Sequence, residues 1–272
     1  MTEDILSYHQ KDLVRLLCEI DLKKLYPDFA AEERKRFDKN WKDFLCSNRR
    51  EKEIFNLEGD VLTYQSEQLI PNKNDQRPPL LLILGNPASH SIKAGMFFSF
   101  EGDKKEHRFW KNILKPSGVL YFTYDNKQSI EALNESRKKQ LLELNYESRF
   151  RIGLCVYISM PSTSTGPWSG IAGVQKLLGA NAMKRLEGVE QKRVLECAKK
   201  FLSPNGVAVA FQKNAWNDLK SDVDKPYNIE DAKKGKLVGS LKGMPYITLL
   251  GVPPTRLSGP CSRILHQLLN GR

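Results

Sequence analysis

Pro79-Leu80-Leu81-Leu82-Ile83-Leu84, followed by Gly85-Asn86-Pro87, is the stretch of sequence that decides the fold. A short apolar run that ends in turn residues is typical of a β-strand buried on both faces. Three similar runs follow, over residues 151–160, 207–211 and 246–250. Because helical patterns separate these runs, the sequence predicts an α/β fold, namely a three-layer α/β/α sandwich with a four-stranded parallel sheet.

The chain is expected to have two parts. Residues 1–70 are predicted to be a helical N-terminal extension, because two sets of apolar residues recur there at helix spacing. These sets are Leu13, Leu16, Leu17 and Ile20, and Phe37, Trp41, Phe44 and Leu45. A Pro- and Asn-containing linker leads into the main domain, residues 79–272, which carries a lysine-rich surface insertion at 217–243. Its helices are predicted at 107–114, 129–144, 194–202 and 261–269.

Charge is distributed unevenly along the chain. Residues 1–78 contain 14 basic and 16 acidic side chains, whereas residues 79–272 contain 29 and 16. A domain this basic is typical of a polyanion-binding surface, although many basic domains bind no polyanion. The chain has no apolar run long enough to span a bilayer and no apolar signal core near its start. The five isolated cysteines favour reduced thiols in a cytoplasmic protein. The four scattered histidines show no metal-ligand spacing, so we expect neither a metal nor a cofactor.

Two loops rich in Pro and Gly follow predicted strands, at residues 85–89 and 251–258. In parallel sheets, ligands bind beyond the carboxyl ends of the strands, so we expect both loops at one edge of the sheet. Three phenylalanines lie shortly after the first loop, at 97, 98 and 100. They form either part of the core or a platform on which a nucleic-acid base stacks. The Ser/Thr cluster at 162–165 is either a phosphate contact or a plain loop.

Five short motifs occur one after another along residues 84–258. They are Leu84-Gly85-Asn86-Pro87, Gly95-Met96-Phe97-Phe98-Ser99, His107-Arg108-Phe109-Trp110-Lys111, Phe211-Gln212-Lys213-Asn214-Ala215 and Pro253-Pro254-Thr255-Arg256-Leu257-Ser258. In this order the motifs resemble the uracil-DNA glycosylase superfamily, with the mismatch-specific thymine/uracil branches nearest. The resemblance covers residues 79–272.

The resemblance implies roles for individual residues. Asn86 would orient the attacking water, and Phe98 would stack on the extruded base. His90 would contact a phosphate or assist the departing base, with a structural role as the alternative. The remaining base-binding candidates are Gly85, Pro87, Ala88 and Ser99. The DNA-binding candidates are Lys213, Pro254, Thr255, Arg256, Leu257 and Ser258, of which Arg256 or Leu257 would fill the gap left by the flipped base.

The sequence also departs from the family pattern. Leu84 replaces the first glycine of the opening motif, and Pro253 stands where some branches carry a histidine that stabilises the departing base. The asparagine that many branches keep after the second strand is absent, and residues 159–164 occupy its place. Ala88 replaces the tyrosine that excludes thymine in the strictest uracil-specific branch, which leaves room for larger bases.

These observations predict a monofunctional DNA glycosylase that hydrolyses the N-glycosidic bond of uracil or another deaminated or altered base. Its partner would be DNA, double-stranded and carrying a damaged or mismatched base, with the protein acting as a monomer and away from membranes. It would work in the cytoplasm, or in the nucleoid or nucleus where DNA lies. The alternative is a non-catalytic superfamily member that binds nucleic acid or a protein. An unrelated enzyme of small nucleotides is disfavoured, because no glycine-rich phosphate loop is present.

Overall fold

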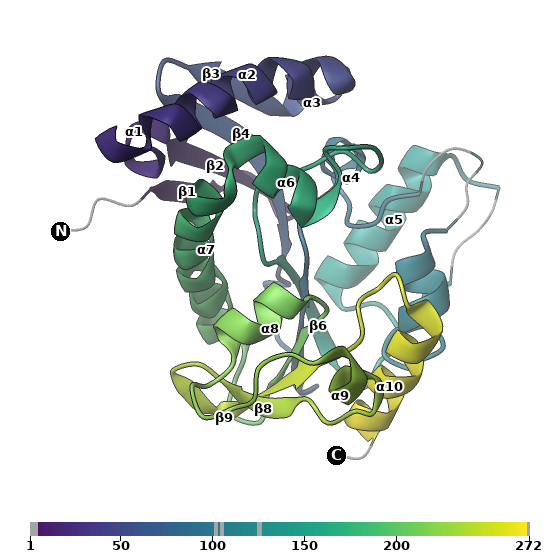
Figure 1. Ribbon diagram of the computed structural model, residues 1–272. Helices are drawn as coiled ribbons and strands as arrows, with labels where there is room; N and C mark the ends of the chain where they lie inside the picture. The colour runs from purple at the N-terminus through teal and green to yellow at the C-terminus, as the bar shows by residue number, and fades with distance from the viewer. Residues whose placement is uncertain (1–4, 101–102, 104–105, 124–126, 271–272) are drawn as a thin grey trace. The chain divides into compact units, whose positions relative to one another are not determined.

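The computed structural model describes residues 5–100, 103, 106–123 and 127–270 (Figure 1). This described part is mixed α/β and contains nine strands. The chain divides into two compact units, each built from separate stretches of sequence. Unit 1 comprises Met1–Gln68, Gly85–Phe97 and Val156–Arg193, and unit 2 comprises Leu69–Leu84, Phe98–Cys155 and Val194–Arg272.

Unit 1 begins with strands where a helical extension was predicted. They are β1 (Leu6–Gln10), β2 (Arg15–Asp21), β3 (Phe55–Glu58) and β4 (Val61–Leu69). β2 pairs antiparallel with β1 and β4, and β3 pairs antiparallel with β4. The prediction of a wholly helical segment over 1–70 is therefore wrong. Leu16, Cys18 and Ile20 are buried while the residues between them are more exposed, which is the period of two that a strand requires.

The helices of unit 1 include the second predicted helical stripe. They are α1 (Leu22–Leu25), η1 (Asp28–Ala30), α2 (Ala31–Ser47), α3 (Glu51–Ile54), α4 (Ser89–Ala94), α6 (Gly170–Leu178) and most of α7 (Ala180–Phe201), which continues into unit 2. Figure 1 shows α2 lying along β3. Phe37, Trp41 and Phe44 form the buried face of α2, which confirms three members of that stripe, whereas the fourth, Leu45, is only half-buried. The Phe44 ring lies edge-on to Phe55, with 5.2 Å between the ring centroids.

Replacing Phe44 with alanine should destabilise the protein strongly. The side chain is 1% exposed and also contacts the Trp168 ring at 6.1 Å, so its removal leaves a cavity among aromatic rings. We expect Phe44→Ala to lower the free energy of unfolding by about 3–5 kcal/mol. Phe29→Ala is the matched control, because Phe29 is 85% exposed and its loss should change stability by less than about 0.5 kcal/mol. Urea denaturation of both variants checks this, and equal effects would contradict it.

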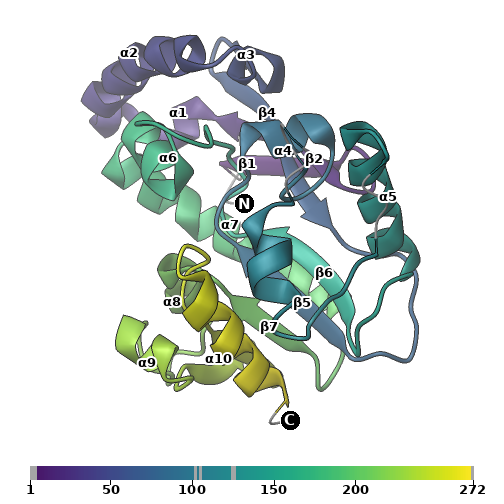
Figure 2. The same ribbon diagram turned by 90° about the vertical axis from the view of Figure 1, so that its right-hand side faces the viewer.

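Unit 2 contains the four strands that the sequence predicted. They are β5 (Pro79–Leu84), β6 (Arg151–Val156), β7 (Val207–Ala210) and β9 (Met244–Gly251), joined by β8 (Val238–Leu241). Their order is β6-β5-β7-β9-β8, and Figure 2 shows β6, β5 and β7 side by side. β5 and β7 are parallel, as are β7 and β9, whereas β8 runs antiparallel to β9. The sheet is therefore mixed, because the predicted insertion at 217–243 supplies the edge strand β8.

Unit 2 also contains helices, and local sequence signals set the two ends of α5 (Ile130–Glu143). The helices are η2 (Phe109–Leu114), α5, α8 (Lys213–Leu219), α9 (Ile229–Lys233) and α10 (Ser258–Asn270). The Ser129 hydroxyl accepts a hydrogen bond from the Ala132 N–H and caps the start of α5, and Leu144 ends it in a left-handed conformation.

No helix of the described residues has the length and apolar character needed to cross a membrane.

The β8 edge is covered by the loop after α8. The backbone N–H of Ser240 donates to the Asp224 carboxylate at 2.9 Å, and the Ser240 carbonyl accepts from the Ser221 N–H at 2.9 Å. Gly239 lies directly beneath Asp224, and a Cβ atom there would come within 2.4 Å of the Asp224 carboxylate. A side chain at 239 would therefore push the Asp224 carboxylate away from the Ser240 N–H.

β4 carries a buried carboxyl group with an unusual pKa. Glu67 is 2% exposed, and its Oε1 atom has no hydrogen-bond partner in the described part of the chain. Burial raises the pKa of this carboxyl to about 8 from an ordinary value near 4.5. The folded protein therefore keeps the Glu67 proton over a pH range in which the unfolded chain releases it.

We predict that this proton makes stability depend on pH. The contribution of Glu67 is fully present below about pH 4.5 and is lost as pH rises to about 8, by up to about 5 kcal/mol. Glu67→Gln removes the titration, so the variant should gain stability relative to the parent as pH rises through this range. Urea denaturation of both proteins between pH 4 and 9 measures the difference. Two curves that stay parallel would show that Glu67 does not hold its proton.

Candidate functional site around Asn86

The Asn86 side chain is fixed in one orientation. It follows β5 directly, and its Nδ2 atom donates to the Ser162 hydroxyl at 2.9 Å and to the Met160 carbonyl at 3.2 Å. A backbone carbonyl can only accept, so the NH₂ end of the amide faces Met160. The opposite end, Oδ1, has no hydrogen-bond partner among the described residues, and Asn86 as a whole is only partly buried. That oxygen is available to accept a hydrogen bond from a water molecule.

Ser162 joins the loop after β6 to the loop after β5. Its hydroxyl accepts from Asn86 and from the Gly170 N–H at 2.8 Å, so both acceptor positions are used. Its backbone N–H donates to the Pro87 carbonyl, and its carbonyl accepts from the Ser89 N–H, each at 3.1 Å. These bonds clamp the Gly-Asn-Pro turn on both sides. Ser162 was predicted only as part of a Ser/Thr cluster of unassigned role.

A buried carboxyl lies one hydrogen bond further along. Glu51, on α3, is fully buried and accepts from the Ser89 hydroxyl at 2.6 Å. Burial raises the pKa of the Glu51 carboxyl, and the Ser89 hydrogen bond partly opposes that shift. This contact could not be predicted from the sequence, because Glu51 stands in a charged stretch that is typical of a solvent-exposed helix.

An ion pair within α7 holds the segment that precedes Met160. Arg193 Nε donates to Glu190 Oε2 at 2.6 Å, and both side chains are buried. Glu190 accepts from the Ser159 N–H at 2.6 Å and from the Ser159 hydroxyl. Arg193 also donates to the carbonyls of Val156 and Tyr157. The backbone of residues 156–159 is thereby held by two charged side chains.

Two further groups complete this buried cluster. The Tyr64 hydroxyl lies 2.7 Å from the Ser159 hydroxyl, and burial raises its pKa well above the ordinary value. Burial also raises the pKa of the nearby Cys18 thiol to about 12, so the thiol stays protonated and unreactive at neutral pH. The cluster therefore supports the loop structurally and offers no nucleophile.

The remaining predicted residues of unit 1 lie around the same turn. Gly85 accepts from the Ile158 N–H at 3.0 Å, and Ala88 forms an isolated bridge with Ser162. His90 lies half-buried in the first turn of α4, between the buried Ser89 and Ser91. Unit 1 thus brings together Gly85, Asn86, Pro87, Ala88 and His90 with the loop after β6.

Phe98 belongs to unit 2 and is already packed against other rings. Its ring lies nearly parallel to those of His107 and Phe109, with centroid distances of 4.6 and 4.3 Å. Its backbone is in the left-handed region, with φ of 45°, and its carbonyl accepts from Trp110 Nε1 at 2.9 Å. Ser99, beside it, is buried. Stacking of an extruded base on Phe98 would have to displace one of these rings.

The predicted DNA-contacting residues are also in unit 2. Lys213 and Arg256 are exposed, while Pro254, Thr255, Leu257 and Ser258 are partly exposed. The Leu257 N–H donates to the Pro254 carbonyl at 2.8 Å, which closes a turn before α10. Tyr227, from the 217–243 segment, donates to the Val252 carbonyl at 3.2 Å and holds the start of this loop. That this loop and Asn86 form one pocket stays a prediction.

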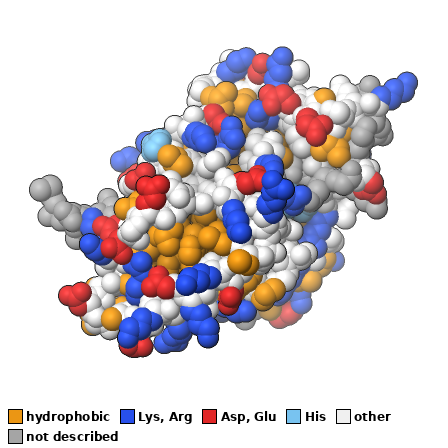
Figure 3. Space-filling view, turned by 90° about the horizontal axis from the view of Figure 1, so that it is seen from above, with side chains coloured by type: hydrophobic (Ala, Val, Ile, Leu, Met, Phe, Trp, Pro, Cys, Tyr) orange, Lys and Arg blue, Asp and Glu red, His pale blue; other side chains and the backbone are white. Residues whose placement is uncertain are grey.

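Neither the surface charges nor the metal-ligating residues of the described chain identify a function. Figure 3 shows Lys and Arg side chains interspersed with Asp and Glu over the face it presents. Among the described residues, no group of three or more His, Cys, Asp or Glu side chains could hold a metal ion. Comparison of the sequence with family models and with curated proteins gives no match.

We expect the buried charges of Glu190 and Arg193 to be tolerated because each neutralises the other, so that removing one alone destabilises the protein. Arg193→Met leaves the Glu190 carboxylate buried without its partner and should lower the free energy of unfolding by about 3–5 kcal/mol. The double variant Glu190→Gln/Arg193→Met should recover most of this loss, because the glutamine oxygen can still accept from Ser159.

Lys35→Met is the control for this experiment. It breaks an exposed pair with Glu32 and should cost less than about 1 kcal/mol. Urea denaturation measures all three variants. A double variant no more stable than Arg193→Met would contradict the expected compensation.

Proposed function

We propose that this protein is a monofunctional DNA glycosylase that removes uracil or another deaminated or altered base. The fixed orientation of the Asn86 amide carries the proposal. A side-chain oxygen held at the end of a core strand, with its amide nitrogen tied to two acceptors, is suited to orienting a water molecule. The ordered set of motifs that resembles the uracil-DNA glycosylase superfamily supports the same assignment.

The proposed reaction hydrolyses the N-glycosidic bond of a nucleotide turned out of the duplex, which costs a few kcal/mol of stacking and pairing. As the bond breaks, the sugar gains positive charge and the base takes the electron pair. A water held by Asn86 Oδ1 forms the new bond to the anomeric carbon and loses a proton to solvent. Backbone N–H groups of the loop would stabilise charge on the base. No lysine precedes Lys93 in this loop, which favours hydrolysis over a Schiff-base route.

The fold supports the proposal in its strand order. β6, β5, β7 and β9 are neighbours, and the turn with Asn86 follows β5. We take these four strands as the core of a three-layer α/β/α sandwich, with β8 added at its edge. The proposed partner is double-stranded DNA with a damaged or mismatched base, bound by a monomer wherever the cell keeps its DNA. Lys213 and Arg256 would contact phosphates, which makes binding sensitive to salt.

A non-catalytic DNA-binding role is the second candidate. The ring contacts of Phe98 favour it, because His107 and Phe109 occupy the surface that a base would use. The absence of the histidine at 253 and of the asparagine after β6 points the same way.

Asn86→Ala distinguishes the two candidates. The purified protein is incubated with duplexes that contain uracil, hypoxanthine, xanthine or a thymine mismatch, and abasic sites are then cleaved by hot alkali. We expect the parent to release at least one of these bases. Asn86→Ala should slow that release by about 10²-fold or more, because the water loses its acceptor, while DNA affinity stays unchanged.

Asn56→Ala is the matched control, since Asn56 is exposed and its amide donates to the nearby Glu58 carboxylate, far from Asn86 in the sequence. That variant should keep full activity. Intact strands on every substrate would overturn the glycosylase proposal. A salt-sensitive DNA complex that forms without cleavage and is unaffected by Asn86→Ala would favour the non-catalytic role.

A further inference from the structure

Unit 2 contains a cavity of about 530 Å³ at the end of the sheet where its parallel strands begin. Its walls include Arg149, Phe150, Asn205, Tyr246, Thr248 and Leu269. This is the opposite end of β9 from the loop at 251–258. The volume falls within the range of small-molecule sites, roughly 300–1,000 Å³. A site here would be independent of the proposed glycosylase chemistry.

Arg149 supplies a positive charge that pairs with no carboxylate among residues 5–100, 103, 106–123 and 127–270. Its guanidinium lies 4.8 Å from the centroid of the Phe150 ring and donates one hydrogen bond to the Leu269 carbonyl. With one face against a ring, the guanidinium keeps further N–H groups directed outward in its plane. Those groups match the geometry of a carboxylate or phosphate.

Aromatic and polar side chains accompany this charge. Tyr246 is 55% exposed, although its neighbour Ile247 and most of the rest of β9 are buried. An exposed aromatic ring at a cavity wall provides a surface on which a flat ring can stack. The Asn205 amide adds a group that both donates and accepts hydrogen bonds. The combination suits a ligand that is flat, has a polar edge and carries a negative charge.

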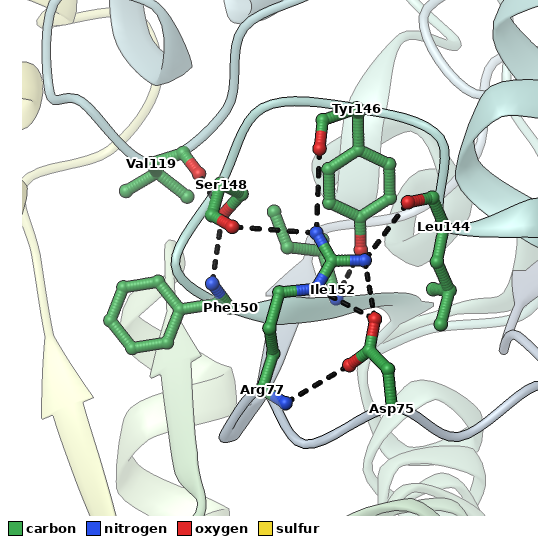
Figure 4. A network of polar contacts seen from close by, with 8 residues as sticks. All are labelled: Asp75, Arg77, Val119, Leu144, Tyr146, Ser148, Phe150 and Ile152. Atoms are coloured by element: carbon green, nitrogen blue, oxygen red, sulfur yellow. Dashed lines mark hydrogen bonds and ion pairs between the residues drawn. The ribbon is translucent and has the colours of Figure 1, made fainter.

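The wall that carries Arg149 and Phe150 is held rigidly. Arg77 precedes β5, and the loop before β6 curves around its side chain (Figure 4). The guanidinium pairs with Asp75 and donates to the carbonyls of Leu144, Tyr146 and Ser148. The Arg77 guanidinium also lies 4.6 Å from the Tyr146 ring centroid. The Ser148 hydroxyl accepts from the Phe150 N–H and donates to the Val119 carbonyl. A wall fixed before binding loses little conformational entropy on binding, which favours affinity.

We propose that this cavity binds a mononucleotide. The phosphate would pair with the Arg149 guanidinium, the base would stack on Tyr246, and Asn205 would bond to the edge of the base. A simple inorganic anion would leave most of the cavity empty, and an apolar ligand would make no use of the positive charge of Arg149. The shared chemistry is an aromatic ring that carries an anionic group, and an aryl carboxylate is the second source of that chemistry.

Isothermal titration calorimetry with the full-length chain at low salt tests the site. The probes are 5′-UMP, 5′-AMP, uridine, inorganic phosphate and benzoate. We expect one molecule of a mononucleotide per chain, bound at least tenfold more tightly than uridine, phosphate or benzoate. Arg149→Gln and Tyr246→Ala should each weaken nucleotide binding at least tenfold. Arg263→Gln, which removes another exposed arginine of unit 2, should leave it unchanged.

The variants also separate this site from the proposed DNA site. Asn86→Ala and Phe98→Ala should bind nucleotides as the parent does. Thermal unfolding checks that each variant is folded, and if Arg149→Gln is not, Arg149→Lys keeps the charge and should still weaken binding by losing the paired N–H groups. The proposal is overturned by the absence of nucleotide binding, by equal binding in the parent and the Arg149 variant, or by benzoate binding as tightly as the nucleotides. Nucleotide binding that depends on Phe98 and not on Arg149 also overturns it.

Discussion

The buried ion pair between Glu190 and Arg193 is the constraint on which the Asn86 site depends. Two charges removed from water are tolerated only when their remaining hydrogen-bonding groups are satisfied. Here those groups are satisfied by the backbone of residues 156–159. The position of that segment sets where the Met160 carbonyl and the Ser162 hydroxyl lie, and these two groups orient Asn86. A helix residue far along the chain thus determines the direction of a loop side chain.

Local patterns were sufficient for much of the fold. The four apolar runs were correctly predicted as β5, β6, β7 and β9, although β6 ends at Val156 and its predicted run extends to residue 160. Short, mostly apolar runs are typical of strands in the buried part of a sheet. The helix α5 also begins and ends where its capping serine and Leu144 place it. The position of Asn86 at a strand end follows from the same reasoning, since the turn and the strand are adjacent in sequence.

Contacts between distant residues were beyond the reach of these patterns. Leu16 and Ile20 are compatible with both helix and strand spacing, and pairing with β4, more than 40 residues later, selected the strand. The bond between Asn86 and Met160 joins residues 74 positions apart, and the bond between Tyr64 and Ser159 joins residues 95 apart. The burial of Glu67 is likewise decided by what packs around it. The spacing of apolar residues describes a single helix or strand and does not show which other parts of the chain pack against it.

The cover over β8 has a consequence for the behaviour of the protein in concentrated solution. A bare sheet edge offers a row of backbone groups to which a strand of another molecule can add. At Ser240 these groups are already bonded to Asp224 and Ser221, and a register shift beside Leu241 bends the strand. We therefore expect this edge to resist the addition of a strand from another molecule, and Gly239, which has no side chain, leaves room for the Asp224 carboxylate that covers it.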